Sequence, residues 1–134
     1  MTTFLWFKFS KKEALFFALT VLLDAFAILI SKDIVQKNRP TNGLIYVPGF
    51  SFPSGHTAIV VVFFGLLVYL LMPKIKSYLF KNTLVLGSIL IILFVGFTRV
   101  YLNVHWLTDV IGGLALGMFV LTGSIFLRDT MSMQ

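Results

Sequence analysis

The sequence predicts an all-α fold, a transmembrane helical bundle, because the chain is rich in apolar residues, poor in charge and divided into four long apolar stretches. Hydrophobic residues make up 58% of the 134 residues and charged residues 12%, about half the charged share of a soluble domain. The stretches are continuous rather than alternating, which disfavours strands. Each reaches the length of a spanning helix, about 20 residues, once a few flanking residues join it.

The predicted spans cover residues 13–31, 55–73, 82–100 and 105–127. The first is not a convincing signal peptide, because it lacks a small-residue cleavage site and contains Asp24. A charge inside a span is costly and is usually functional or paired. For Asp24 three interpretations stay open: contact with a helix absent from this chain, contact with a partner subunit, or protonation.

Four spans place both chain ends on one side of the membrane, and the basic residues assign that side. The net charge is +6, which we attribute to the flanks of membrane spans rather than to nucleic-acid binding. One side carries Lys8, Lys11, Lys12, Lys74, Lys76, Lys81 and Arg128, and the other carries Lys32, Lys37, Arg39 and Arg99. The positive-inside rule predicts that the first group is cytoplasmic.

The chain has no cysteine, so it offers neither a disulfide nor a thiolate zinc site, and the redox compartment cannot be inferred from cysteine usage. It also lacks a carboxylate cluster that would suit a divalent cation.

The other side of the membrane receives the chemically active residues from several helix ends. Three cations, Lys32, Arg39 and Arg99, suit a phosphate dianion, since guanidinium groups bind its oxygens in a bidentate manner. Ser54 and Gly55 open a helix after Pro53, where free N–H groups and the helix dipole favour an anion.

Two histidines and one carboxylate join these residues. His105 and Asp109 are four residues apart and are expected on one face of a helix. A carboxylate on one ring nitrogen would leave the other nitrogen nucleophilic. His56 would then protonate the leaving alkoxide as a general acid.

These residues form a pattern with three elements. They are Lys32 to Arg39-Pro40, then Pro53-Ser54-Gly55-His56, then Thr98-Arg99 with His105 and Asp109. The pattern resembles that of the type 2 phosphatidic acid phosphatase family, which includes lipid phosphate phosphatases and vanadium haloperoxidases. The resemblance extends over residues 14–127, and the spacing and order of the three elements make it specific.

The resemblance implies a single membrane phosphatase domain over residues 1–134 and a role for each matched residue. Lys32, Arg39, Ser54, Gly55 and Arg99 would bind phosphate. His105 would attack phosphorus and form a phosphohistidine, Asp109 would orient it, and His56 would protonate the leaving group. The family implies no metal and no cofactor. The expected partners are a membrane lipid phosphate and the bilayer, with homo-oligomers left open.

Two features depart from the family pattern. Thr98 replaces the usual Ser and keeps the hydroxyl. Bacterial membrane members usually have six spans, and the chain is expected to lack the first two, although the matched residues lie on the last four. The site is expected on the extracytoplasmic side of a bacterial plasma membrane.

The substrate stays open among phosphatidate, phosphatidylglycerophosphate and undecaprenyl diphosphate. Three alternative functions also stay open: a phosphotransferase that uses the same site, an inactive fragment, or a regulatory subunit that binds lipid. A haloperoxidase is least favoured, since those relatives are soluble.

Several other residues receive structural interpretations. Lys37 and Asp33 are interpreted as surface charges, and Gly113 with Gly117 as a small-residue stripe for close helix packing. Tyr101 and Trp106 are interpreted as interfacial anchors, with Trp106 near enough to His105 to border the substrate. Three loop aromatics either cover an acyl chain or lie in the interface: Tyr46, Phe50 and Phe52.

Overall fold

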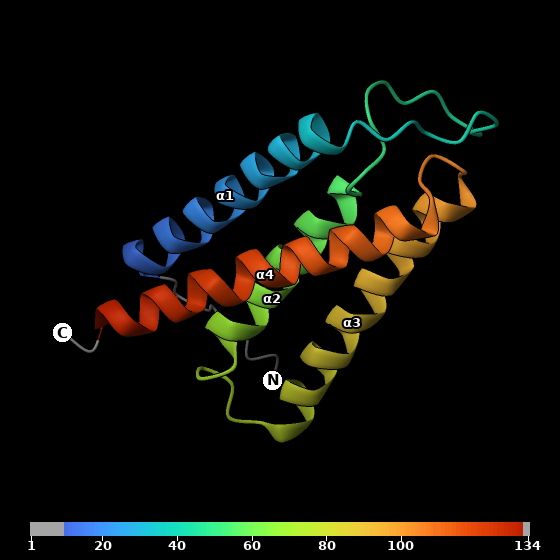
Figure 1. Cartoon of the computed structure of the whole chain (residues 1–134). Helices are drawn as coiled ribbons and strands as arrows, with labels where there is room; N and C mark the ends of the chain where they lie inside the picture. Colours follow the sequence, from blue (N-terminus) through green and yellow to red (C-terminus); the bar gives the residue numbers. More distant parts are fainter. Residues whose placement is uncertain (1–9, 133–134) are drawn as a thin grey trace.

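The computed structural model describes residues 10–132, which form four helices and, within that range, no strand (Figure 1). The helices are α1 (Lys11–Val35), α2 (Gly55–Leu71), α3 (Tyr78–Tyr101) and α4 (Leu107–Ser132). The predicted all-α class is confirmed. In α1, α3 and the Leu107–Met131 part of α4, length and apolar composition suffice to cross a membrane, whereas α2 is a shorter apolar helix of 17 residues.

The helix boundaries differ from the predicted spans for local reasons. α1 continues to Val35, where Gln36 takes the left-handed conformation and ends the helix. α2 stops at Leu71, short of the predicted residue 73, because Pro73 cannot donate a backbone hydrogen bond. α3 starts at Tyr78, earlier than residue 82, because Ser77 caps it. α4 starts at Leu107 rather than at residue 105, which places His105 in the preceding turn.

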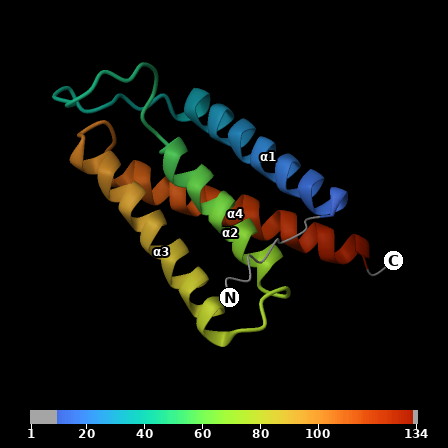
Figure 2. The same cartoon turned by 180° about the vertical axis from the view of Figure 1, so that it is seen from behind.

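α2 is the central helix, and its closest neighbour is α4. Glycines permit this approach: a Cβ on Gly113 would lie 2.5 Å from the Ser54 carbonyl oxygen, and one on Gly117 would lie 2.7 Å from that of Ala58. The predicted small-residue packing stripe is therefore confirmed. Buried residues Val62, Leu66, Val120 and Leu121 form the core between the two helices. Both views show α3 and α4 meeting at their connecting turn and diverging toward their other ends (Figures 1 and 2).

Asp24 lies within α1 with a fully buried side chain, and neither carboxyl oxygen has a hydrogen-bond partner. No surface of Asp24 is exposed in this arrangement. Since a buried ionised carboxylate without a partner is very unfavourable, these surroundings favour the interpretation that Asp24 is protonated.

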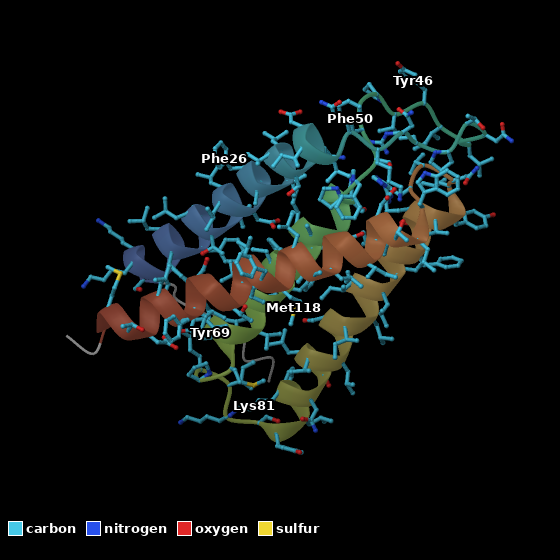
Figure 3. All side chains as sticks on the ribbon, viewed as in Figure 1. Phe26, Tyr46, Phe50, Tyr69, Lys81 and Met118 are labelled. Carbon is cyan, nitrogen blue, oxygen red and sulfur yellow. The ribbon has the colours of Figure 1, made fainter. Side chains whose placement is uncertain are left out.

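One end of the bundle gathers the basic residues that were assigned to the cytoplasm. Lys74 forms an ion pair of 2.7 Å with Glu13, which joins the α2–α3 loop to the start of α1. The Arg128 guanidinium lies 4.8 Å from the Phe16 ring centroid and 5.3 Å from that of Tyr69. Lys81 is at this end, far from Tyr46 and Phe50 in the α1–α2 loop (Figure 3). Lys8 lies outside the described residues.

Candidate active site

The opposite end of the bundle holds a cavity of about 280 Å³ to which every helix or its adjoining loop contributes. Six of the eight predicted site residues line it: Lys32, Arg39, Gly55, His56, Arg99 and His105. Apolar side chains complete the wall, namely Val47, Ile59 and Val104. The structure thus brings together residues that are up to 73 positions apart in the sequence, from Lys32 to His105.

Two of the three cations also hold the α1–α2 loop in place. Lys32 Nζ donates to the Phe50 carbonyl oxygen at 2.6 Å. Arg39 donates from Nε to the Gly49 carbonyl at 3.0 Å, from Nη1 to that of Val104 at 2.8 Å and from Nη2 to that of Phe50 at 3.2 Å. Neutral carbonyls are weaker partners for these groups than an anion would be, so a phosphate group can replace some of these contacts.

The contact between Arg39 and His105 fixes the tautomer of the histidine. Arg39 Nη1 lies 3.2 Å from His105 Nε2. A guanidinium can only donate, so Nε2 must be the unprotonated nitrogen, with its lone pair directed toward Arg39 Nη1. The proton of a neutral imidazole is therefore on Nδ1, the nitrogen that faces Asp109.

Asp109 lies behind His105, away from the cavity. Its Oδ2 is 3.5 Å from His105 Nδ1, longer than a hydrogen bond, and Nδ1 has no closer partner. The same oxygen accepts from the Trp106 backbone N–H at 2.9 Å, the contact that a residue in the first turn makes with the N-cap backbone. The predicted pairing of His105 and Asp109 therefore spans a turn and the start of α4, not one helix face.

His105 is held in its neutral form. Burial is the largest cause, and the positive charges of Arg39 and Lys32 add to it, so that the pKa of His105 falls to about 4. The nearby Asp109 carboxylate acts in the opposite direction but does not reverse the shift. A neutral imidazole at pH 7 is the state that a nucleophile requires.

The start of α2 forms another part of the wall. Gly55 and His56 line the cavity in the first turn, where backbone N–H groups are free of helix partners. Ser54 does not line it: the side chain is fully buried, and its hydroxyl accepts from Thr57 Oγ1 at 2.9 Å. The Ser54 N–H donates to the Asp109 carbonyl at 2.9 Å, so Ser54 connects α2 to α4 behind the site.

Lys37 was predicted as a plain surface charge, and that prediction is wrong. Its Nζ lies 2.6 Å from Asp109 Oδ1 and 2.6 Å from Thr108 Oγ1. Nothing in the sequence indicated this contact, because it depends on how the α1–α2 loop folds across the start of α4. Asp33 is exposed, in agreement with its predicted place on the surface.

The aromatic residues singled out in the sequence have different surroundings. Trp106 donates from Nε1 to the Asn38 carbonyl at 3.0 Å, so it binds the loop beside the site. Tyr101 is exposed and stacks on Phe97 with ring centroids 5.9 Å apart. Tyr46 is almost wholly exposed at the outer side of the loop, whereas Phe50 lies near the end of α1 (Figure 3).

A solved structure shares this fold, and curated proteins are similar to the chain in sequence. The crystal structure of a transmembrane PAP2-type phosphatidylglycerolphosphate phosphatase from Bacillus subtilis is similar with a TM-score of 0.80 and 29% identity, over 88% of this chain and 60% of that one. Phosphatidylglycerophosphatase B of Bacillus subtilis (strain 168) is 33% identical over 95 residues, which are 68% of this chain and 46% of the relative.

A second curated relative is the lipid A 4'-phosphatase of Porphyromonas gingivalis, 28% identical over 134 aligned residues, with 87% of this chain and 53% of the relative covered. The chain thus spans about half the length of the curated relatives it matches. The family model described as the PAP2 superfamily matches residues 13–130, and with its apolar helices and its transmembrane structural relative the chain is an integral membrane protein that belongs to this superfamily.

Proposed function

We propose that this chain is a lipid phosphatase that removes a phosphate group through a phosphohistidine on His105. One observation carries the proposal: the buried His105, whose Nε2 lies 3.2 Å from Arg39 Nη1, lines a cavity together with three cations. The relatives, which are named as phosphatases of lipids, support the same reaction class.

Binding would begin with the phosphate group entering the cavity. Lys32, Arg39 and Arg99 supply the positive charge, and the first turn of α2 supplies N–H groups at the positive end of the helix dipole. Arg39 would exchange carbonyl partners for phosphate oxygens, and in doing so it would release the lone pair of His105 Nε2.

The first chemical step would then be in-line displacement. A bond forms between His105 Nε2 and phosphorus while the bond from phosphorus to the lipid oxygen breaks. The imidazole becomes cationic as it bonds, and Asp109 stabilises it once the 3.5 Å contact at Nδ1 shortens, as such contacts do in reacting complexes. The negative charge of the bound phosphate favours uptake of a proton from solvent by His56, which transfers this proton to the departing alkoxide.

The second step would regenerate the enzyme. His56, now neutral, takes a proton from a water molecule that attacks phosphorus, and the bond from phosphorus to Nε2 breaks. Inorganic phosphate leaves and His105 is again neutral. Transfer to an acceptor other than water would use the same intermediate, so the phosphotransferase alternative differs only in the second step.

A lipid substrate agrees with the surroundings of the site. The cavity is at the end of apolar helices, where a headgroup meets the membrane surface. A second cavity of about 320 Å³ lies between α3 and α4, is lined only by apolar residues and one glycine, and includes Val100 and Leu107 next to the site. It offers a place for an acyl chain.

Among the candidate lipids, phosphatidylglycerophosphate is the first to test, because both Bacillus subtilis relatives are named for it. Phosphatidate and undecaprenyl diphosphate remain candidates, since the residues of the site recognise only phosphate. We place the site on the extracytoplasmic side of a bacterial plasma membrane because the basic residues gather at the opposite end.

The test is phosphate release from these lipids, and from lipid A, by purified protein in detergent with a chelator. Release that disappears in His105→Ala, with an unchanged melting temperature, is the expected result. Well-folded wild-type protein that binds a lipid phosphate but releases no phosphate would support the regulatory or fragment alternative and contradict the proposal.

A further inference from the structure

The strongest feature outside the proposed mechanism is the environment of Lys37, which follows α1 in the loop. Its ammonium group lies 2.6 Å from both Asp109 Oδ1 and Thr108 Oγ1. It is also 5.9 Å from the ring centroids of Phe52 and Trp106, within reach of cation–π attraction. Four groups from three segments therefore converge on one cation.

The backbone at Lys37 is fixed as firmly as the side chain. Ser51 donates to the Lys37 carbonyl oxygen both from its backbone N–H at 2.8 Å and from its hydroxyl at 3.1 Å. The next carbonyl, that of Asn38, accepts from Trp106 Nε1 at 3.0 Å. Arg39 follows directly, so one short segment contacts both the carboxylate behind His105 and the lone pair in front of it.

The two carboxylate oxygens of Asp109 have different partners. Oδ1 binds Lys37, and Oδ2 accepts from the Trp106 N–H and faces His105 Nδ1. Asp109 is fully buried, whereas the Lys37 side chain is 32% exposed. A buried carboxylate needs such partners to remain ionised. Lys37 does not line the cavity, so it acts on the carboxylate and not on the phosphate.

We infer that Lys37 is a positioning residue that holds the Asp109 carboxylate in place and shares its charge, so that His105 stays neutral until phosphoryl transfer begins. The inference rests on the proposed function of His105. While Lys37 holds Oδ1, the carboxylate cannot rotate away from Nδ1. When the imidazole becomes cationic, the Oδ2 contact can strengthen without movement of Asp109.

The first test measures the two histidines directly by NMR titration of labelled protein in detergent. The chain contains only His56 and His105, so the His56→Gln variant assigns both signals. Lys37→Met removes the cation and nearly preserves the length of the side chain. It leaves the other ionisable groups around His105 unchanged, namely Lys32, Arg39, His56, Arg99 and Asp109.

The expected shift has a definite sign. Without the ammonium group, a positive charge near His105 disappears and more of the negative charge of Asp109 acts on Nδ1. Both effects favour the imidazolium, so the titration midpoint of His105 should move to higher pH while that of His56 moves less. Lys37→Arg should keep the wild-type midpoint. The matched control is Lys76→Met, since Lys76 is exposed in the α2–α3 loop and should leave both midpoints unchanged.

Turnover provides the second readout. Lys37→Met should lower kcat by about 10- to 100-fold, a loss typical of removing the partner that orients a functional side chain, with KM changed less than about twofold. Lys37→Arg should recover most of kcat. If Lys37→Met does not fold, Lys37→Gln provides the same comparison with a polar side chain.

Two results would overturn the inference. An unchanged His105 midpoint in folded Lys37→Met would show that Lys37 does not act through Asp109. A rise in KM at constant kcat would show a direct contact with substrate. Wild-type protein that releases no phosphate would instead contradict the proposed function. The NMR titration would still show whether Lys37 acts on His105 through Asp109.

Discussion

Arg39 Nη1 lies 3.2 Å from Nε2 of His105, so a proposed phosphate ligand is in direct contact with the proposed nucleophile. In this contact the lone pair of the neutral imidazole accepts from Arg39. It also means that the nucleophile is covered until Arg39 finds a stronger acceptor. A phosphate group is such an acceptor, so we expect phosphate binding to Arg39 to expose Nε2.

Arg39→Lys tests this coupling. Lysine keeps the charge but loses the planar fork that holds the loop carbonyls and would grip phosphate. We expect inhibition by vanadate, a phosphate analogue, to weaken by about tenfold or more, the effect of losing one charge-assisted contact. Arg128→Lys, at the opposite end of the bundle, is the control. Equal vanadate inhibition of the wild type and Arg39→Lys would contradict the role of Arg39.

Substrates with different leaving groups should distinguish the roles of the two histidines. His105→Ala should abolish both turnover and acid-labile labelling by a radioactive phosphate ester. His56→Ala should slow lipid phosphate cleavage by about 10²- to 10⁴-fold, the usual contribution of a general acid. A nitrophenyl phosphate, whose leaving group needs no proton, should form the phosphoenzyme at nearly the wild-type rate in His56→Ala. A similar defect with both leaving groups would exclude His56 as the general acid.

Stability should depend on pH through His105. Its pKa falls from 6.5 to about 4 in the folded chain, so between these values the unfolded chain binds a proton that the folded chain does not. Stability is therefore greatest above pH 6.5 and declines as the pH falls toward 4, by at most about 3 kcal/mol. The melting temperature in detergent should show this decline, and His105→Gln should reduce it. An identical pH dependence in His105→Gln would contradict the assignment.

Site residues at helix ends could be predicted from the sequence, whereas contacts that depend on the fold of a loop could not. Hydropathy predicted four helices because a bilayer requires long apolar segments. The motif residues were predictable because each lies at or near a helix end, and helix ends at one membrane surface meet. Their positions at helix ends were enough to predict that Lys32, His56 and Arg99 lie at the site.

Loop-dependent features could not be predicted in the same way. The ion pair of Lys37 with Asp109 joins residues 72 positions apart and requires the α1–α2 loop to cross the start of α4. Likewise, His105 lies outside α4 because Asp109 makes its contact with the Trp106 N–H in the first turn. Spacing of four residues suggested a helix face, but it cannot distinguish a helix from a turn that leads into one.

Two separate glycine-to-alanine variants test the packing of α4 on α2. Gly113→Ala would place a Cβ 2.5 Å from the Ser54 carbonyl oxygen, so α4 must move and Asp109 with it. Overpacking of this kind costs about 1 to 3 kcal/mol, and both the melting temperature and kcat should fall. Gly123→Ala is the matched control, because a Cβ there meets nothing within 4 Å. Equal stability of the two variants would contradict this packing.

Cysteine labelling tests the membrane topology directly, because the sequence contains no native cysteine. Asn42 lies in the α1–α2 loop on the side of the site, and Lys76 lies in the α2–α3 loop. If α2 crosses the bilayer despite its 17 residues, Asn42→Cys should react with an impermeant maleimide on intact cells. Lys76→Cys should react only after the membrane is opened. Labelling of both on intact cells would show that α2 does not cross, and the site would then lie on the same side as the basic residues.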